Sequence, residues 1–248
     1  MKLSRLAVLA SAAALVVAGS ASASTWVSSG TSTASGALDG QAIITITGNT
    51  MVVKLSDLLT DTKNAGEEVS GVEIILANPE KSVSLTGESG QVINITGKGS
   101  TGYTTSNAAI GHWGVTEVGS DIFLATAGTG AAGGKPYDLI IGQQAKYLDA
   151  NASITQHSPS IEGTGTFTIN LTPTSNTAPA PTILGVKIEF GTGPDNLVNA
   201  TCSALCTLGG QVNASVPEPR TWGLMIVGFM GVGGLIRAER RRKALNAA

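Results

Sequence analysis

Two cysteines are the side chains best suited to form a covalent link in this chain. Cys202 and Cys206 are its only cysteines, and in an oxidising compartment they would pair as a disulfide that closes a five-residue loop. Free thiols and a metal pair are the alternatives. Zinc needs four ligands, and no histidine lies near the two cysteines in the sequence. We therefore expect a disulfide and no metal.

Catalysis would have to use His112 or His157, the only histidines, or one of the scattered carboxylates. A hydrolase needs a nucleophile, a base and an orienting group, and no motif spacing joins such residues here. We expect His112 at the start of a strand and His157 in a loop. Glu67 and Glu68 would point to opposite faces of an extended chain, which does not suit the carboxylate pair of a glycosidase. We interpret this pair as a solvated turn and predict neither an enzyme nor a cofactor.

Four aspartates lie at predicted turns, where carboxylates often cap backbone N–H groups. Turn carboxylates and backbone carbonyls also bind calcium in secreted β-proteins, although no EF-hand or nonapeptide pattern is present. Calcium binding therefore stays open as an alternative. The four residues are Asp121, Asp138, Asp149 and Asp195.

The N-terminal segment has the three regions of a secretory signal peptide. Lys2 and Arg5 precede an apolar run over residues 6–19, and small residues follow. We predict a signal peptide over residues 1–23, inserted by the Sec translocon and cut by signal peptidase between Ala23 and Ser24. An uncleaved membrane anchor is the alternative, but the apolar run is shorter than the ~20 residues of a spanning helix.

The C-terminal segment, residues 217–243, also has three parts. Pro217, Glu218 and Pro219 form a short motif (217–219), and Trp222 begins a run without charge that extends to Ile236. That run, the predicted membrane helix 222–236, spans roughly 22 Å and is shorter than the ~30 Å hydrocarbon core, so it would be a marginal permanent anchor. A basic cluster over 237–243 follows, which we expect to stop transfer. It consists of Arg237, Arg240, Arg241, Arg242 and Lys243.

Motif, apolar helix and basic cluster in this order resemble the PEP-CTERM sorting segment. The resemblance implies a partner, an exosortase-like membrane enzyme that cuts near the Pro-Glu-Pro motif and delivers the protein to the cell surface. An ordinary anchor of low quality is the alternative. A looser resemblance to PEP-CTERM surface proteins of uncharacterised activity covers Gly134–Gly142, Asn151–Ile154 and Phe190–Asp195, and it implies no chemistry.

Charge and hydropathy together predict the topology. Both apolar ends carry basic flanks, which stay in the cytoplasm by the positive-inside rule, so the middle must lie outside the inner membrane. This middle, residues 24–216, has seven lysines, no arginine and fifteen acidic residues, which gives a net charge of −8. Such a balance argues against a nucleic-acid partner because phosphate binding needs clustered cations.

The middle of the chain predicts an all-β fold. Short alternating apolar runs separated by turn residues are typical of an antiparallel β-sandwich or jelly roll, here over residues 24–206, with a spacer over 207–216. The signal helix and the single membrane helix would flank it. Gly48-Asn49 and Gly119-Ser120 are predicted tight turns. Residues 24–40 show little periodicity, and Ser56 or Asp57 could cap a short helix or turn before Gly66.

These features predict an exported component of the cell envelope or extracellular matrix with a structural or adhesive body. The protein would be a precursor anchored in the inner membrane and then reach the cell surface. A carbohydrate-binding module for exopolysaccharide is the alternative, and it would lose support if Trp113 and Tyr137 were buried. A secreted hydrolase is the third hypothesis. It requires His112 or His157 beside a carboxylate and a hydroxyl.

Overall fold

The computed structural model describes the middle of the chain. The described residues are 22–32, 36–96, 103–106, 108–132, 135–144, 146–147, 149–175, 180–193, 196–204 and 206. Contacts divide the chain into two units, Met1–Gly209 and Gly210–Ala248, and every described residue belongs to the first. The expected signal helix up to residue 21 and the expected membrane helix 222–236 lie outside the described residues. Within the described ranges, no helix has the length and apolar character needed to cross a bilayer.

Strands dominate the described part of the chain, and the only helix found there is short. In chain order the elements are β1 (Ser22–Ser32), β2 (Gly36–Thr47), β3 (Thr50–Asp57), β4 (Val69–Leu76), β5 (Ser82–Ile95), β6 (Tyr103–Ser106), β7 (Gly114–Val118), β8 (Asp121–Ala125), β9 (Ile140–Ile141), α1 (Ala152–His157), β10 (Ser160–Thr172), β11 (Ile183–Phe190), β12 (Leu197–Asn199) and β13 (Thr201–Ala204).

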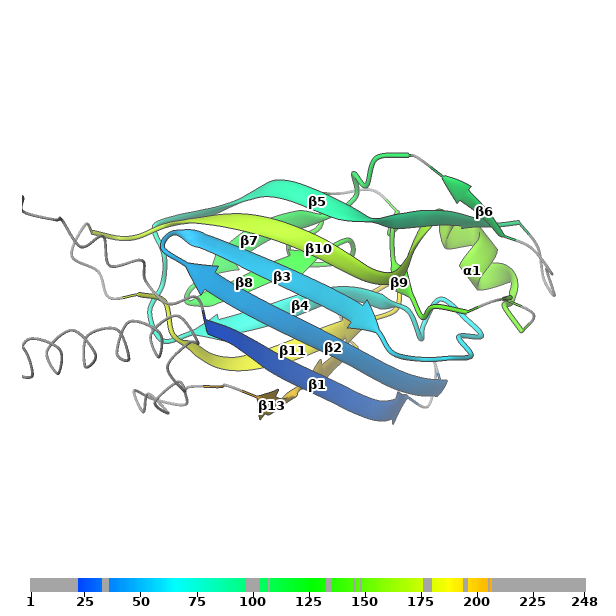
Figure 1. Ribbon diagram of the computed structural model, residues 1–248, viewed down its shortest axis with the longest axis horizontal. Coiled ribbons are helices and arrows are strands. Elements are labelled where there is room, and N and C mark those ends of the chain that lie inside the picture. The colour runs from blue at the N-terminus through cyan, green and yellow to red at the C-terminus, as the bar shows by residue number, and fades with distance from the viewer. Residues whose placement is uncertain are drawn as a thin grey trace, which may run out of the picture. The chain divides into compact units, whose positions relative to one another are not determined.

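The strands form one mixed sheet in the order β12-β11-β4-β9-β10-β3-β2-β1-β13, with β5 and β6 attached at β10 and with β8 and β7 attached at β4. Every pairing is antiparallel except that of β9 with β10. In Figure 1, β1, β2, β3, β10 and β5 lie in front of β11, β4 and β8, so the sheet turns back on itself through the short strand β9. The all-β class is confirmed, but a single mixed sheet replaces two separate antiparallel ones.

The core lies between the two halves of this sheet. In β10, Phe167 and Ile169 are fully buried while Thr166 and Thr168, which alternate with them, are only partly buried, as the period of a strand requires. The Trp113 ring packs against Phe167 with ring centroids 4.3 Å apart. A methyl group on Gly40 of β2 would come within 3.0 Å of Phe190 of β11, so the two halves approach closely. Each large side chain buried here stabilises the fold by roughly 1.5–3 kcal/mol.

The structure confirms the expected turns and shows more strand than the local sequence pattern predicted. Gly48 and Gly119 have positive φ angles of 57° and 69° in the β2–β3 and β7–β8 turns, as predicted. Residues 24–40, which show little periodicity, form strands over their described part, because 24–32 belong to β1 and 36–40 to β2, and the two strands pair at eleven consecutive positions. No helix follows Ser56 and Asp57, which both continue β3, but the turn alternative is confirmed because the Asp57 side chain accepts the Leu59 N–H at 2.9 Å.

The final strands link the two edges of the sheet. β12 pairs with β11 at one end of the strand order, and β13 pairs with β1 at the other. Only Ala200 separates β12 from β13 in the chain. This segment therefore fastens the back half of the sheet to the front half, and it brings the C-terminal end of the described body beside its N-terminal strand.

Candidate functional site

Glu67 and Glu68 are buried, which overturns the expectation of a solvated turn. Their exposed fractions are 5% and 0%. Glu67 accepts hydrogen bonds from the Lys63 backbone N–H at 2.6 Å and from the Asn64 side-chain amide at 3.0 Å. The loop between β3 and β4 folds around this carboxylate, so Glu67 organises the loop rather than facing solvent. Sequence spacing could not reveal this, because the loop is not extended at these residues.

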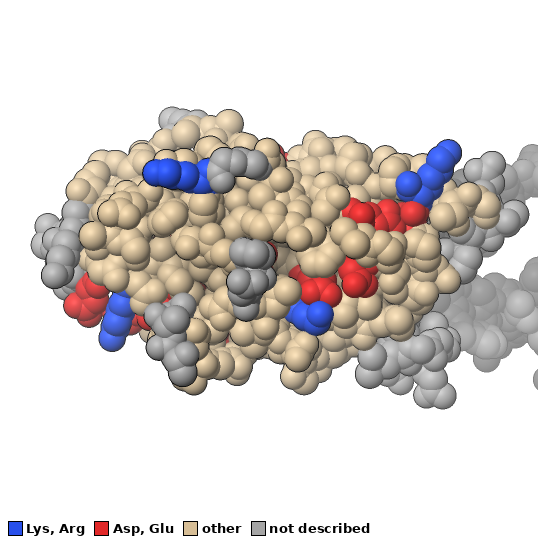
Figure 2. Space-filling view, turned by 180° about the vertical axis from the view of Figure 1, so that it is seen from behind, with Lys and Arg blue, Asp and Glu red and all other residues tan. Residues whose placement is uncertain are grey.

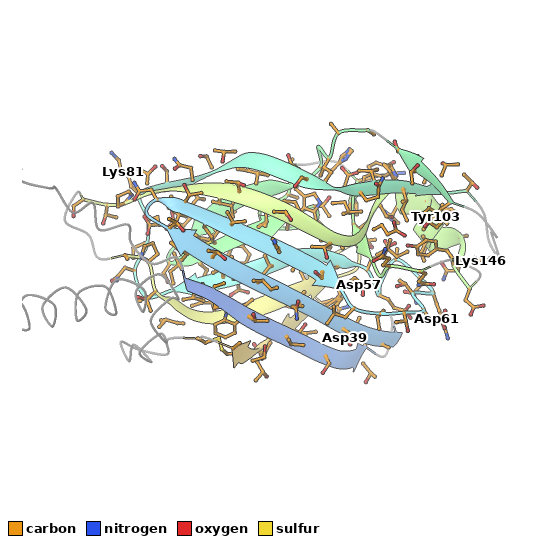
Figure 3. The ribbon with its side chains drawn as sticks, viewed as in Figure 1. Asp39, Asp57, Asp61, Lys81, Tyr103 and Lys146 are labelled. Carbon is orange, nitrogen blue, oxygen red and sulfur yellow. A yellow bond between two sulfur atoms is a disulfide. The ribbon has the colours of Figure 1, made fainter. Side chains whose placement is uncertain are left out.

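Asp57, at the end of β3 (Figure 3), is also buried. One oxygen accepts the Leu59 N–H at 2.9 Å and the other accepts the Gly142 N–H at 2.8 Å. Burial raises the pKa of Asp57 to about 8, although these two hydrogen bonds oppose the shift. Burial, followed by the charge of Asp57, also raises the pKa of Glu68 well above its usual value. The two carboxylates therefore interact across the interior.

Few groups in the described part of the chain satisfy Glu68. The Ser160 hydroxyl lies 3.5 Å from Glu68 Oε1, and Glu68 Oε2 has no hydrogen-bond partner there. The hydroxyl of Thr62, which is 1% exposed and would stand 3.3 Å from a methyl group on Gly142, also has none. Ion pairs among the described residues join Lys63 to Asp61, Lys187 to Glu73 and His112 to Asp138, so none of them neutralises this pair of carboxylates.

A second polar site surrounds Asp138. Its carboxylate Oδ2 lies 2.7 Å from His112 Nδ1 and accepts the Gly111 N–H at 3.1 Å. Asp138 is 1% exposed and has a positive φ of 58°, a conformation that strains most residues but that Asp tolerates. Its own N–H donates to the Pro159 carbonyl, and the Trp113 ring N–H donates to its carbonyl. Hydrogen bonds therefore fix Asp138 through its side chain, its backbone N–H and its carbonyl.

This arrangement brings together a histidine and an orienting carboxylate, two of the three groups that a hydrolase needs. The bond from Nδ1 to Asp138 leaves Nε2 of His112 available, and the His112 side chain is 42% exposed. Among the described residues, no hydroxyl forms a hydrogen bond with the His112 ring. His157 is the last residue of α1 rather than part of a loop, and its Nδ1 contacts the Pro136 carbonyl at 2.8 Å. The nucleophile of the hydrolase hypothesis is therefore missing from this geometry.

The tryptophans of the described body offer no exposed platform for sugars. Trp26 and Trp113 are 4% and 3% exposed, and their ring N–H groups donate to the Ser24 hydroxyl and the Asp138 carbonyl. Tyr137 is half-buried, with its ring 5.1 Å from that of His112. Burial of Trp113 counts against a carbohydrate-binding module, whereas Tyr137 keeps part of its surface accessible.

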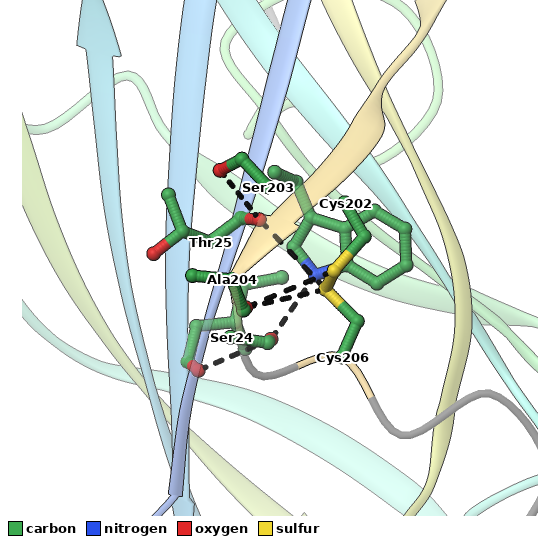
Figure 4. Close-up of a disulfide and its surroundings, with 8 residues drawn as sticks. Ser24, Thr25, Cys202, Ser203, Ala204 and Cys206 are labelled. Carbon is green, nitrogen blue, oxygen red and sulfur yellow. Dashed lines mark hydrogen bonds between the residues drawn. A yellow bond between two sulfur atoms is a disulfide. The ribbon is translucent and has the colours of Figure 1, made fainter.

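Cys202 and Cys206 are joined by a disulfide with their Cα atoms 6.0 Å apart (Figure 4). Cys202 stands opposite Trp26 in the pairing of β13 with β1, and the Ser203 hydroxyl donates to the Thr25 carbonyl at 3.2 Å. The disulfide thus closes the end of β13 beside the first residues of β1. Ala23 and Ser24, the predicted signal-cleavage residues, lie in β1 opposite Thr45 and Ile44 of β2.

The remaining predicted site residues lie outside the described residues. These are the sorting motif Pro217, Glu218, Pro219 and Trp222, and the basic cluster Arg237, Arg240, Arg241, Arg242 and Lys243. Asp195, one of the aspartates considered for calcium, lies outside them as well. Over the described ranges, no three histidine, cysteine or carboxylate side chains form a metal-binding group.

The charge on the visible face of the body is sparse. Figure 2 shows a few lysines, most of them next to acidic side chains, on a surface that is otherwise uncharged, without a gathered basic patch on that face.

Comparisons of the chain with protein-family models, with curated proteins and with solved structures find no match. The sequence and the geometry of the body are therefore the basis for its proposed function.

Proposed function

We propose that the protein is an exported component of the bacterial envelope or extracellular matrix, sorted to the cell surface by an exosortase-like membrane enzyme. Its sandwich-like body, a single mixed sheet that turns back on itself, has a structural or adhesive role without catalysis. The observation that carries this proposal is the order of the C-terminal parts. Pro217, Glu218 and Pro219 precede an apolar run and a basic cluster, and the acidic body before them contains no arginine.

The positions of the two ends of the body support this proposal. Thr25 stands opposite Ala204 in the pairing of β1 with β13, so the chain enters and leaves the described body at neighbouring points. This arrangement is compatible with a precursor whose two ends are held in one membrane. The disulfide beside this point fits an oxidising compartment outside the cytoplasm.

The use of the buried acids supports a structural role. Asp57, Glu67 and Asp138 each accept backbone N–H groups from loops that follow or face them in the fold. Side chains used in this way fix loop conformations, because each satisfies backbone N–H groups that would be costly to bury without a partner. The body is therefore built as a rigid unit, which suits a spacer or an adhesive module.

Mass spectrometry of the mature protein tests the sorting step. We expect the protein from wild-type cells to end near Pro217 and to fractionate with the surface. In cells that lack the sorting enzyme, it should keep residues 217–248 and stay with the inner membrane. Identical C-termini in both strains would contradict the proposal.

Matched tail variants separate the parts of the signal. Replacing Pro217, Glu218 and Pro219 with alanine should block processing while leaving the precursor in the membrane. Replacing Arg240, Arg241 and Arg242 with glutamine should weaken retention of the tail in the cytoplasm, whereas the same positions changed to lysine keep the charge and should process normally. Equal processing of the glutamine and lysine variants would show that the basic cluster has no part in sorting.

A further inference from the structure

One end of the body contains a group of buried oxygen atoms that the fold does not fully use. Asp57, Thr62, Glu68 and Ser160 are between 0% and 4% exposed, and they come from the end of β3, the following loop, the residue before β4 and the start of β10. Figure 3 shows Asp57 at the end of β3, toward the end of the body where α1 lies. The group therefore belongs to four segments that only the folded chain brings together.

The hydrogen bonds account for only part of this group. Each oxygen of Asp57 accepts one backbone N–H, but Glu68 Oε2 and Thr62 Oγ1 have no partner among the described residues. Leaving a buried polar atom unsatisfied is costly, and native proteins rarely do so. Thr62 carries no charge, so its unpartnered hydroxyl is an observation independent of the two acids. Both unpartnered atoms indicate that a polar ligand completes the site.

Gly142 lies beside three of the oxygen-bearing groups at this end of the body. Its N–H donates to Asp57, and a methyl group placed on it would stand 3.3 Å from Thr62 Oγ1. The same methyl group would collide with the Leu59 carbonyl oxygen. The Leu59 carbonyl, the Thr62 hydroxyl and the Asp57 carboxylate thus all approach one glycine, and a backbone oxygen is added to the group.

The carboxylates of Asp57 and Glu68 need protons or a cation to balance their negative charge in the interior. The body between the apolar ends has no arginine, and the ion pairs of the described residues involve other acids. Two buried carboxylates that repel each other must bind protons or a cation. The two choices differ in one respect, because protonation leaves the Thr62 hydroxyl unexplained while a cation uses it.

We propose that a single calcium ion binds in the interior beside Asp57 and Glu68, with the Thr62 hydroxyl completing the site. Calcium takes six to eight oxygen ligands in flexible geometry and accepts carboxylates, backbone carbonyls and water together. The site holds no histidine or cysteine, which zinc prefers. Only two of its side chains, Asp57 and Glu68, are ionisable, so the site resembles the weaker calcium sites of extracellular modules. The proposal does not depend on how the protein is sorted.

Calorimetric titration of the full chain, purified in detergent and stripped with EDTA, tests the site. We expect one calcium ion per chain with a Kd of about 10⁻⁴ to 10⁻³ M, the range of extracellular modules. Calcium at about 10 mM should raise the Tm by about 5 °C, because a ligand that binds only the folded state stabilises it. Absence of binding in this range, with equal Tm in calcium and EDTA, would overturn the proposal.

Two variants and one control make the assignment specific. Thr62→Val keeps the shape of the side chain and Glu68→Gln keeps its length, and each should weaken calcium binding by about tenfold or more. Glu88→Gln changes a partly buried carboxylate whose pKa is also raised by burial, and it should bind calcium like the wild type. If Thr62→Val binds as tightly as the wild type, calcium does not use this group. If Glu68→Gln is too unstable to titrate, Thr62→Val alone decides the outcome.

Discussion

Asp138 and Glu68 are both almost completely buried, yet their surroundings differ. Asp138 has an imidazole at 2.7 Å and a backbone N–H at 3.1 Å on the same carboxylate oxygen. Glu68 has a single serine hydroxyl at 3.5 Å, and its second oxygen has no partner among the described residues. The first carboxylate completes a polar network inside the protein. The second leaves one incomplete.

This difference shows that burial alone does not define the role of an acid. A buried carboxylate with an imidazole and a backbone N–H as hydrogen-bond partners stabilises the loops it joins, and removal of one partner is costly. A buried carboxylate without such partners opposes folding at neutral pH, unless a ligand supplies the missing charge. The two sites should therefore respond in opposite directions when the charge is removed.

The largest change in stability is expected at Gly142, which packs against the Leu59 carbonyl and donates its N–H to Asp57. In Gly142→Ala the new methyl group would overlap the Leu59 carbonyl oxygen, so the loop after β3 must move away. We expect a loss of about 3 kcal/mol or more in the free energy of unfolding, measured by urea denaturation. Gly111→Ala, beside the Asp138 site, meets no atom within 4 Å and should change stability by less than about 0.5 kcal/mol. Equal losses in the two variants would break the comparison.

Asp138→Asn should destabilise the protein by about 2 kcal/mol, because it removes a charged acceptor from His112 and Gly111 in a buried position. Asn tolerates a positive φ as Asp does, so the backbone is not the cause. Urea denaturation measures the loss, and histidine NMR signals would report the altered His112 environment. Unchanged stability would mean that the network around Asp138 contributes little.

Glu68→Gln should have the opposite sign when calcium is absent. The pKa of Glu68 in the folded protein lies well above 4.5, so in the wild type this group lowers stability as pH rises above its unfolded value. The slope is at most about 1.4 kcal/mol per pH unit for one group. In EDTA at pH 8 we expect the variant to be more stable by about 1 kcal/mol, with a flatter pH dependence.

Asp57 supplies the internal check for this experiment. Its pKa rises from 3.8 to about 8, so a decline in stability between about pH 4 and pH 8 should remain in Glu68→Gln. Denaturation curves across this pH range would separate the two groups. A steeper decline in the variant than in the wild type would contradict the assignment.

Thr62→Val should have the smallest effect on stability in EDTA. Its hydroxyl has no hydrogen-bond partner among the described residues, so replacing it with a methyl group loses no hydrogen bond. We expect a change within about 0.5 kcal/mol, or a small gain, in urea denaturation. A loss above about 1 kcal/mol would show that the hydroxyl has a partner even without calcium.

Local sequence patterns predicted much of the fold. The turns at Gly48 and Gly119 followed from the tolerance of glycine for positive φ, and the alternation around Phe167 followed from the period of a strand. The weakly patterned β1 was missed because its strand conformation depends on β2 as a partner. The helix α1 carried a usable signal, since the Asn151 side chain accepts the Ser153 N–H as an N-cap.

The sequence alone determined the features that depend on hydropathy, charge and short-range geometry. The apolar ends with basic flanks, the acidic body and the β class are of this kind, because each residue acts there largely by itself or through near neighbours. Only the tertiary structure decided which acids are buried and what they contact. Asp57 and Gly142 are 85 residues apart and Glu68 and Ser160 are 92 apart. Burial and pKa at such sites depend on which distant segments exclude water, and no local pattern encodes that.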